Sequence, residues 1–191
     1  MTITADVTVV QIRHGETEWS LEGRHTSFSD VALTARGRDE ARPLAARLAA
    51  IDFARVLTSP RRRARETCEL AGLGKHAEVT DDLDEWNYGD YEGLTTAEIR
   101  AEVPGWTIFS NGAPGGETAD EITARADRVI AWAAEAGGVV ALFSHGHFLR
   151  VVGARWIGLP ASGGSRLALD TATVSFLGHE HDERVLRMWN S

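Results

Sequence analysis

Residues 7–15 read VTVVQIRHG, and the fold is interpreted outward from this stretch. Val7 to Ile12 is a short β-branched run, which is typical of a buried strand. The residues that follow, RHGETEW (13–19), are too polar to continue such a strand. The sequence therefore predicts a buried strand that ends where two chemically useful side chains, Arg13 and His14, begin.

The same change from strand to reactive segment occurs twice more. Ala54 to Thr58 reads as a short strand and is followed by Ser59 to Arg65, while Val139 to Phe143 is strongly strand-like and ends at Ser144-His145-Gly146. In an open α/β sheet, ligands bind beyond the carboxyl ends of the strands. The pattern therefore brings two histidines and several arginines to one edge of a sheet.

Helices are predicted between these strands. Thr34 begins one that runs to about Ala50, and Pro43 within it predicts a kink or a late start. Ser59-Pro60 reads as the N-cap and first residue of a second helix, which runs to about Ala71. Two capping boxes, Thr95-Thr96-Ala97-Glu98 and Thr118-Ala119-Asp120-Glu121, begin a short helix and a longer one that runs to about Ala136.

The rest of the chain completes an α/β pattern. Ala77 to Gly116 reads as irregular apart from its one short helix, and Phe148 to Ile157 reads as a helix. Thr173 to Gly178 and Val185 to Trp189 form a closing pair of strands, which can add an antiparallel edge. Alternating strands and helices predict an α/β fold, a three-layer α/β/α sandwich around a mostly parallel sheet, and 191 residues suit a single domain over 1–191.

Composition narrows the functional classes. Hydrophobic residues make up 43% and charged residues 25%, which is typical of globular proteins, and the net charge of −8 disfavours nucleic acid or anionic membranes as partners. The start MTITADVTVV has no basic n-region, and no window approaches the ~18 apolar residues of a membrane span. The single cysteine, Cys68, gives no support to an oxidising compartment. A cytoplasmic protein is expected.

The clustered side chains suit phosphate chemistry. The planar fork of arginine binds two phosphate oxygens at once, and Arg13 and one arginine of the run Arg61 to Arg65 are the candidates. One histidine can take the phosphoryl group as a nucleophile, and a second, when protonated, can stabilise the charge on its oxygens. A carboxylic acid must then protonate the leaving oxygen. Glu85 is favoured for this role over its acidic neighbours Asp82, Asp84, Asp90 and Glu92.

Several motifs carry a resemblance to a known family. RHGETEW resembles the signature of the histidine phosphatase superfamily, which is also called phosphoglycerate mutase-like. DVALTARG, TSPRRRARETCEL, LDEWNYGDYEG, GGET and FSHGHFLR follow in the family's order. The resemblance implies a phosphoglycerate mutase-like fold and a metal-independent phosphomonoester hydrolase that uses no cofactor.

The resemblance also implies residue roles. His14 aligns with the histidine that carries the phosphoryl group, Arg13 and Arg63 with phosphate-binding arginines, His145 with the second core histidine, and Glu85 with the acid. Substrate contacts are expected at five further positions: Ser20, Arg24, Thr26, Glu117 and His147. His179 and His181 could suggest a metal pair, but their polar turn predicts exposed side chains and no metal.

One branch of the family fits better than others. The runs HGETEWS, SPRRRARET, EWNYGDYEG and HGHFLR resemble sedoheptulose-bisphosphatase-like and broad sugar-phosphate phosphatases. His147 stands where the cofactor-dependent mutases carry asparagine, and the 31 residues from Trp86 to Gly116 are a shorter insertion than theirs, which favours entry of water. Thr26-Ser27 departs from the family's frequent Thr-Gly. A small phosphorylated metabolite, a sugar phosphate or bisphosphate, is the expected substrate.

Three alternatives remain open. The same chemistry serves a phosphoglycerate mutase, in which the phosphoryl group returns to a hydroxyl instead of passing to water. A phospho-ligand sensor would keep the fold without turnover, although none of the five core positions is lost. A metal-dependent mechanism is the third. The strand pair near the C-terminus could present an edge to a second copy, so a homodimer is a further expectation.

Overall fold

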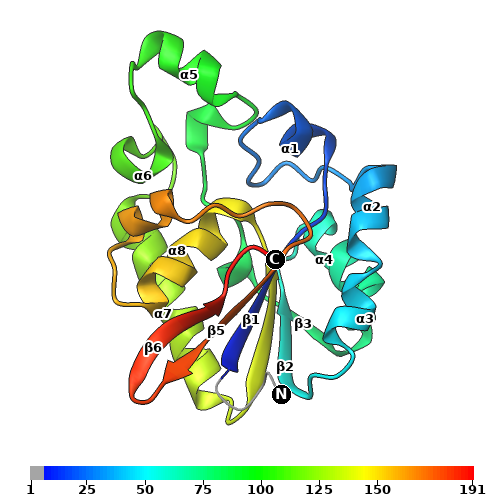
Figure 1. Ribbon diagram of the computed structural model, residues 1–191. Coiled ribbons are helices and arrows are strands. Elements are labelled where there is room, and N and C mark those ends of the chain that lie inside the picture. The colour runs from blue at the N-terminus through cyan, green and yellow to red at the C-terminus, as the bar shows by residue number, and fades with distance from the viewer. Residues whose placement is uncertain (1–6) are drawn as a thin grey trace.

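The structure, a computed structural model, describes residues 7–191 (Figure 1). Most of the N-terminal stretch judged for a leader sequence, residues 1–6, lies outside these residues. The strands are β1 (Val7–Arg13), β2 (Phe53–Thr58), β3 (Ala77–Val79), β4 (Val139–Ser144), β5 (Val174–Glu180) and β6 (Glu183–Met188). The α-helices are α1 (Glu18–Glu22), α2 (Ala35–Ala41), α3 (Leu44–Leu48), α4 (Arg62–Leu70), α5 (Thr96–Glu102), α6 (Ile108–Asn111), α7 (Ala119–Glu135) and α8 (Gly146–Trp156).

A six-stranded sheet in the order β3-β2-β4-β1-β5-β6 forms the centre of the fold. The neighbours β3, β2, β4 and β1 pair in parallel, whereas β5 runs antiparallel to β1 and β6 antiparallel to β5. The predicted α/β class and mostly parallel sheet are therefore confirmed, and so is the antiparallel pair at one edge. Because β1, β2 and β4 are parallel, their carboxyl ends lie at the same edge of the sheet.

Helices cover both faces of this sheet (Figure 1). Alternate strand residues point to opposite faces, so Val9 and Leu142 pack with buried side chains of α7 and α8, while Val10 and Phe143 pack with those of α2 to α4. In α7 the buried side chains follow a helical period: Ile122, Ala126, Val129, Ile130 and Ala133. The two cores fix the sheet on both sides and hold its functional edge in place.

The structure tests three predictions about the ends and positions of single helices and strands. The kink at Pro43 is confirmed, because α2 ends at Ala41 and α3 begins at Leu44. The N-cap prediction at Ser59-Pro60 is wrong: α4 begins at Arg62, two residues later than expected, and the Ser59 hydroxyl, which accepts from the N–H of Arg61, also bonds to His145 and Asp84. The segment predicted as irregular also contains β3 and α6, which are too short to give a clear sequence period.

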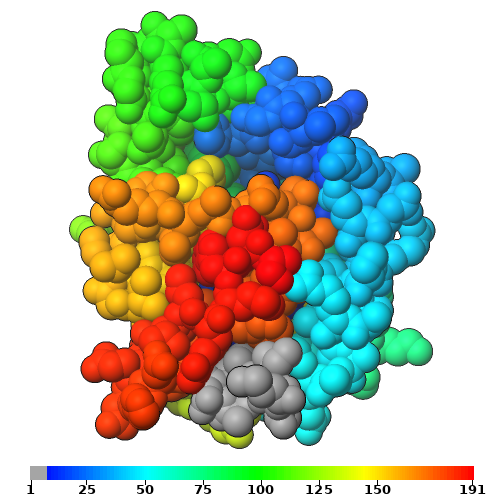
Figure 2. Space-filling model, in the orientation of Figure 1, coloured from blue at the N-terminus to red at the C-terminus, as the bar shows by residue number. Residues whose placement is uncertain are grey.

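Two segments stand over the carboxyl edge of the sheet. Figures 1 and 2 show α5 and α6 (green) beside the segment that carries α1 (blue). They are joined by an isolated bridge between Arg24 and Thr95. These segments wall the space above the strand ends. Among the described residues, no helix is long and apolar enough to cross a membrane.

Candidate active site

The ends of three parallel strands bring the predicted catalytic segments together. The backbone N–H of His14 donates to the carbonyl of Ser144 (3.0 Å), and the N–H of Ser59 donates to the carbonyl of Phe143 (3.0 Å). The rings of His14 and His145 consequently meet edge to face, with their centroids 5.2 Å apart. Strand pairing alone therefore accounts for the approach of the two histidines.

The glycine of the RHG triplet is required by the packing of α2. A Cβ at Gly15 would lie 2.4 Å from the carbonyl oxygen of Gly37, and a Cβ at Gly37 would lie 2.1 Å from that of Glu16. The two backbones are therefore in direct contact, which only glycine allows. The N–H of Gly15 donates to Thr67 Oγ1 (3.0 Å), so α4 also holds the turn that carries His14.

His14 is a buried neutral imidazole with one defined tautomer. Its Nδ1 lies 2.8 Å from the carbonyl oxygen of Gly15, which can only accept, so Nδ1 carries the proton. Nε2 has no hydrogen bond among the described residues and keeps its lone pair. Burial, followed by the charges of Arg63 and Arg13, holds the pKa of His14 well below its usual value. A neutral histidine with an available Nε2 is the state that a nucleophile requires.

Arg13 presents free donors to the same space. One of its terminal nitrogens donates to the carbonyl of Leu169, while its buried Nε has no partner among the described residues. Desolvation lowers the pKa of Arg13, although Glu85 opposes this effect. Because a buried guanidinium with unused donors is unfavourable, the side chain is suited to receive an anion.

Arg63, by contrast, is fully buried and hydrogen-bonded to protein groups. Its Nε donates to His145 Nδ1 (3.1 Å), and its terminal nitrogens donate to the carbonyls of Thr26, Ser27 and Ser29 (2.9–3.1 Å). These four bonds use most of the five N–H groups of arginine. Arg63 therefore joins the second histidine to the loop of residues 26–29.

His145 is held at both ring nitrogens. Since Nδ1 accepts from Arg63, the proton is on Nε2, which donates to Ser59 Oγ (2.8 Å). Ser59 donates in turn to Asp84 Oδ1 (2.8 Å), and Arg61 pairs with the Asp84 carboxylate through two bonds (2.8 and 3.0 Å). Burial and the charge of Arg63 keep the pKa of His145 well below its usual value, so the imidazole is neutral here.

Glu85 is buried close to the beginning of α8. Its carboxylate accepts from the backbone N–H groups of Trp86 (2.9 Å), Phe148 (2.8 Å) and His147 (3.0 Å). These bonds anchor the side chain on the first turn of α8, which follows directly on β4. Glu85 and His14 consequently face the same cavity.

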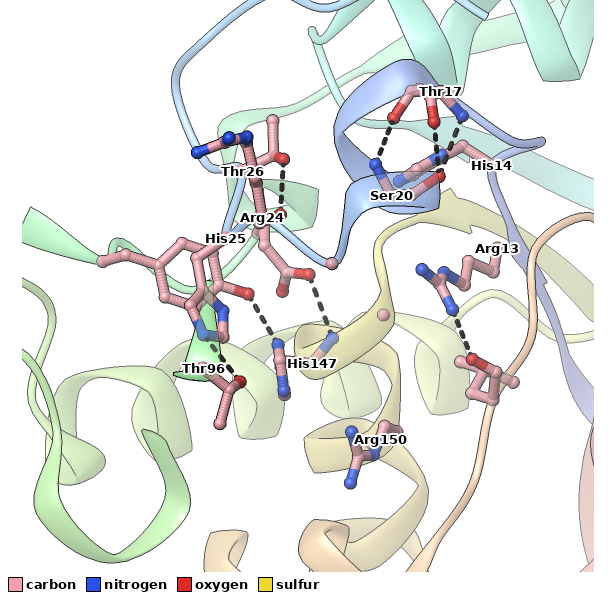
Figure 3. A pocket seen from close by; sticks show the side chains of 15 residues that line it. Arg13, His14, Thr17, Ser20, Arg24, His25, Thr26, Thr96, His147 and Arg150 are labelled. Atoms are coloured by element: carbon pink, nitrogen blue, oxygen red, sulfur yellow. Dashed lines mark hydrogen bonds between the residues drawn. The ribbon is translucent and has the colours of Figure 1, made fainter. Parts of the chain in front are cut away.

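That cavity has a volume of about 270 Å³ (Figure 3). The predicted residues Ser20, Arg24, Thr26 and His147 line it together with Arg13, His14 and Glu85. Arg63 and His145 lie beneath its surface and are not part of the lining. The remaining lining residues are Thr17, Gly23, His25, Tyr88, Thr96, Gly146, Arg150 and Leu169.

Glu117 is not brought to this cavity. Its carboxylate pairs with Arg125 through two bonds (2.7 and 2.9 Å), and both residues line a second hollow of about 510 Å³ beside α7, which Glu85 also lines. Arg125 also donates to the carbonyls of Asp84 and Glu85. The structure therefore places Glu117 as a support for the Glu85 segment rather than at the predicted substrate position.

Eight lining residues were not predicted as site residues, and three of them carry large polar side chains: His25, Tyr88 and Arg150. The Tyr88 hydroxyl contacts His147 Nδ1 (2.6 Å). Burial lowers the pKa of His25 to about 4. Arg150 follows His147 by three residues on α8, so helical spacing was a signal that could have placed it beside His147.

A neutral histidine with an unbonded ring nitrogen, beside arginine and carboxyl groups, is the arrangement that phosphoryl transfer through a phosphohistidine requires. The family model described as "Histidine phosphatase superfamily (branch 1)" matches residues 9–191, and the chain belongs to this superfamily. It is an enzyme of the phosphatase class, and metal independence is typical of the superfamily.

Individual relatives agree with this assignment. An acid phosphatase of Mycobacterium tuberculosis is 46% identical, over 92% of this chain and 88% of the relative. The sedoheptulose 1,7-bisphosphatase of Saccharomyces cerevisiae is 34% identical, over 78% of this chain and 66% of the relative. The solved structure of a Mycobacterium tuberculosis open reading frame superimposes with a TM-score of 0.91 at 43% identity, covering 95% of this chain and 96% of that chain.

Proposed function

We propose that this enzyme hydrolyses phosphate monoesters of small metabolites through a phosphohistidine on His14, with sugar phosphates as the substrate class. The observation that carries the proposal is the state of His14: a neutral imidazole, with its proton tied to the Gly15 carbonyl and Nε2 unbonded in the cavity that Arg13 lines. The names of the relatives, an acid phosphatase and a sugar bisphosphatase, support the same class.

In the first step, His14 Nε2 attacks phosphorus while the bond from phosphorus to the ester oxygen breaks. Arg13 binds the phosphoryl oxygens with its free donors, and Arg63 and His145 add positive charge and polarity from beneath. Glu85, in its acid form, gives its proton to the leaving oxygen. The products of this step are the free alcohol, phosphohistidine and the Glu85 carboxylate.

In the second step, the Glu85 carboxylate takes a proton from water, whose oxygen attacks the phosphorus of phosphohistidine. The P–N bond breaks, phosphate leaves, and both His14 and Glu85 return to their starting states. Ser20, Arg24, Thr26 and His147 would contact the part of the substrate beyond the phosphoryl group, because they line the same cavity.

The proposal also covers the domain organisation, the cellular location and the partners of the protein. We infer that the chain acts as one domain, a view supported by a sheet whose strands run from residue 7 to residue 188. The net charge of −8 supports a small metabolite in the cytoplasm as the partner instead of nucleic acid. A second copy of the chain is a further proposed partner, since β3 and β6 form the two edges of the sheet.

The test combines trapping with leaving-group chemistry. Rapid quenching with a ³²P-labelled substrate should trap an acid-labile, base-stable phosphoryl group on the wild type and none on His14→Ala. Glu85→Gln should lose far more activity on an alkyl phosphate than on p-nitrophenyl phosphate, because nitrophenolate leaves without a proton.

Three results would contradict the proposal. The first is wild-type protein that releases no phosphate from either substrate, and the second is label retained on His14→Ala. The third is conversion of 3-phosphoglycerate to 2-phosphoglycerate, in the presence of bisphosphoglycerate, at a rate above the release of phosphate. That last outcome would assign the protein to the mutases.

A further inference from the structure

Glu92 lies outside the lining of the cavity that contains His14, and its carboxylate is the centre of a group of hydrogen bonds. The backbone N–H of Ser27 donates to both of its oxygens (2.9 Å each), and the Ser27 hydroxyl donates to Oε2 (2.5 Å). The N–H of Ser29 donates to Oε1 (3.1 Å). The carboxylate therefore takes three donors from one loop, residues 26–29. Charge-assisted bonds of this kind are about twice as strong as neutral ones.

The same loop accepts hydrogen bonds from Arg63 on its other side. The donors of Arg63 go to three carbonyls, those of Thr26 (3.1 Å), Ser27 (3.0 Å) and Ser29 (2.9 Å). The carbonyl of Thr26 and the N–H of Ser27 belong to one peptide group. Its oxygen therefore accepts from the guanidinium while its N–H donates to the Glu92 carboxylate. A peptide group between a cation and an anion is polarised by both, which strengthens the two hydrogen bonds.

Arg63 requires a source of negative charge, because its own charge is buried. The side chain is 0% exposed, and its hydrogen bonds go to His145 and to carbonyls, with no carboxylate among residues 7–191 in direct contact. A buried charge without a counter-charge is costly. Burial lowers the pKa of Arg63, and Glu85 and Glu92 are among the groups that oppose this effect. Glu92 therefore supplies negative charge to Arg63 through the loop instead of by direct contact.

Arg63 transmits this constraint to the second histidine of the site. Its Nε donates to His145 Nδ1 (3.1 Å), which orients the ring and leaves the ring proton on Nε2. The ring of His145 in turn lies edge to face with that of His14, at 5.2 Å between centroids. A continuous set of hydrogen bonds therefore leads from Glu92, through the loop and Arg63, to the imidazole beside the nucleophile. Ser59 holds the other ring nitrogen from a different strand end.

The backbone on either side of Glu92 fixes where its carboxylate lies. Glu92 follows the turn Gly89–Tyr91 and precedes α5. The N–H of Gly93 donates to the carbonyl of His25 (2.8 Å), and the N–H of His25 donates to the carbonyl of Leu94 (2.9 Å). Gly93 has a φ of 79°, which a residue with a side chain rarely adopts. The two segments are therefore joined through the backbone, and the carboxylate faces the loop.

We propose that Glu92 is a positioning residue for the reaction: through the loop it holds Arg63, and through Arg63 it holds the His145 imidazole at the phosphoryl site. The alternative is a role in the wall of the cavity alone, because this loop and the residues before it also supply lining side chains (Figure 3): Arg24, His25 and Thr26. The inference rests on the proposed function and adds to it a residue that lies outside the cavity.

The first experiment separates these two roles by their kinetics. Glu92→Gln removes the charge and keeps the shape, so kcat for p-nitrophenyl phosphate should fall about tenfold while KM changes by less than about threefold. Glu92→Ala should lower kcat further, by on the order of 10²-fold, so that glutamine rescues part of the rate. Asp90→Asn, an exposed carboxylate two residues away, should change neither constant. A raised KM with unchanged kcat in Glu92→Gln would assign Glu92 to the wall and overturn the proposal.

The second experiment asks whether the effect of Glu92 passes through Arg63. In an Arg63→Met background, Glu92→Gln should lower kcat by less than about twofold, because the group on which Glu92 acts has been removed. A loss as large as in the wild type would show that Glu92 acts by another route, and would overturn the proposal.

A measurement on the free protein depends neither on turnover nor on the double variant. In ¹⁵N NMR, solvent exchange of the Arg63 Nε–H should be about tenfold faster in Glu92→Gln than in the wild type or in Asp90→Asn, since the guanidinium has lost one charged support. Equal exchange rates in all three proteins would overturn the inference. Faster exchange in Glu92→Gln, with a wild type that releases no phosphate, would contradict only the proposed function, so the two failures are distinguishable.

Discussion

Two layers of the site differ in where their hydrogen-bond donors go. The cavity layer, defined as Arg13, His14 and Glu85, lines the cavity, and among the described residues His14 Nε2 and the buried Arg13 Nε lack partners. The buried layer, defined as Ser59, Arg63 and His145, is 0% exposed, and its donors bond to protein groups. Both layers draw on the same three strand ends and the helices that follow them, and Glu85 joins the cavity layer from the loop after residues 81–83.

The difference assigns separate tasks to the two layers. A donor that already has a good protein partner gains little by exchanging it for a phosphate oxygen, whereas an unpaired one gains a full charge-assisted bond. We therefore propose that the cavity layer performs the chemistry and that the buried layer fixes positions and local charge. Mutations should accordingly separate into losses of rate and losses of stability.

The largest expected effect is in the cavity layer. His14→Ala removes the nucleophile, and we expect kcat to fall by on the order of 10⁴-fold or more, as for nucleophiles of other covalent enzymes. The melting temperature should change little, because the ring makes only one hydrogen bond with the residues that the structure describes, to the carbonyl of Gly15. The exposed His76→Ala is the matched control for assay and folding. Activity of His14→Ala within tenfold of the wild type would remove His14 from the mechanism.

Arg13→Gln should have the second largest effect on the catalytic rate. It removes a charge aimed at the phosphoryl group, and loss of one such donor typically lowers the rate about 10²–10³-fold. Stability should hold, because burial of this guanidinium with an unpaired Nε is itself unfavourable. The readouts are kcat/KM and the urea midpoint. A large fall in the midpoint with modest loss of rate would reverse the assignment of Arg13 to the cavity layer.

Arg63→Met should show the opposite pattern, a larger loss of stability than of catalytic rate. The change leaves His145 Nδ1 and the carbonyls of Thr26, Ser27 and Ser29 without their donor, and each unsatisfied buried group costs about 1–3 kcal/mol. With partial relaxation, unfolding free energy should fall by roughly 3 kcal/mol. Arg65→Met, exposed on the same helix, should stay within about 0.5 kcal/mol of the wild type. A stable but inactive Arg63→Met would instead place Arg63 among the direct phosphate ligands.

Ser59→Ala tests how His145 is positioned. The change removes one acceptor from His145 Nε2 and one donor to the Asp84 carboxylate, which should lower kcat about tenfold, near the value of a single hydrogen bond. Ser59→Thr, which keeps the hydroxyl, should recover part of the rate. KM should change less than kcat, because Ser59 does not line the cavity. An unchanged kcat would mean that Arg63 alone positions the ring.

The sequence predicted the cavity layer more completely than the other residues that line the cavity, such as His25, Tyr88 and Arg150, which form its walls. His14, Arg13 and Glu85 could be placed because strand ends and motifs are local patterns, and so could the α/β class with its parallel strands. The use of Ser59 as a partner of Asp84 could not be foreseen, since residues 25 apart in the chain meet only after the sheet has formed. Glu117 was predicted to contact substrate, whereas its carboxylate pairs with Arg125, eight residues further on in α7, and the motif GGET gives no sign of this pairing.

The walls depend on geometry that a single sequence does not contain. Arg150 was visible within FSHGHFLR, but its free donors become apparent only once the carbonyls of Gly164 and Ser165 are known to take two of them. His25 shows no motif of its own, and its burial arises from the rings of Tyr88 and Trp106, 4.7 and 5.1 Å away. Short connecting segments such as α6 are equally hard to predict from the sequence, because packing sets their position and they are too short to show a hydrophobic period.

The smallest effect concerns pH and the histidine of the wall. His25 has a pKa of about 4 in the folded protein, lowered mainly by burial, whereas Glu92 opposes this effect. In the unfolded chain its pKa is about 6.5, so the unfolded state binds the extra proton first as the pH falls. His25 therefore destabilises the fold progressively below pH ~6.5, by at most about 1.4 kcal/mol per pH unit, until its own folded-state pKa is reached.

His25→Gln should consequently reduce the pH dependence of stability without abolishing it. His14, His145 and His147 also have lowered pKa values and contribute in the same direction. The measurement is the free energy of unfolding in urea between pH 7.5 and 4.5. The slope of His25→Gln should be smaller by up to one proton. An unchanged slope in His25→Gln would show that the wall opens to water below neutral pH, so that His25 takes up its proton as readily in the folded as in the unfolded chain.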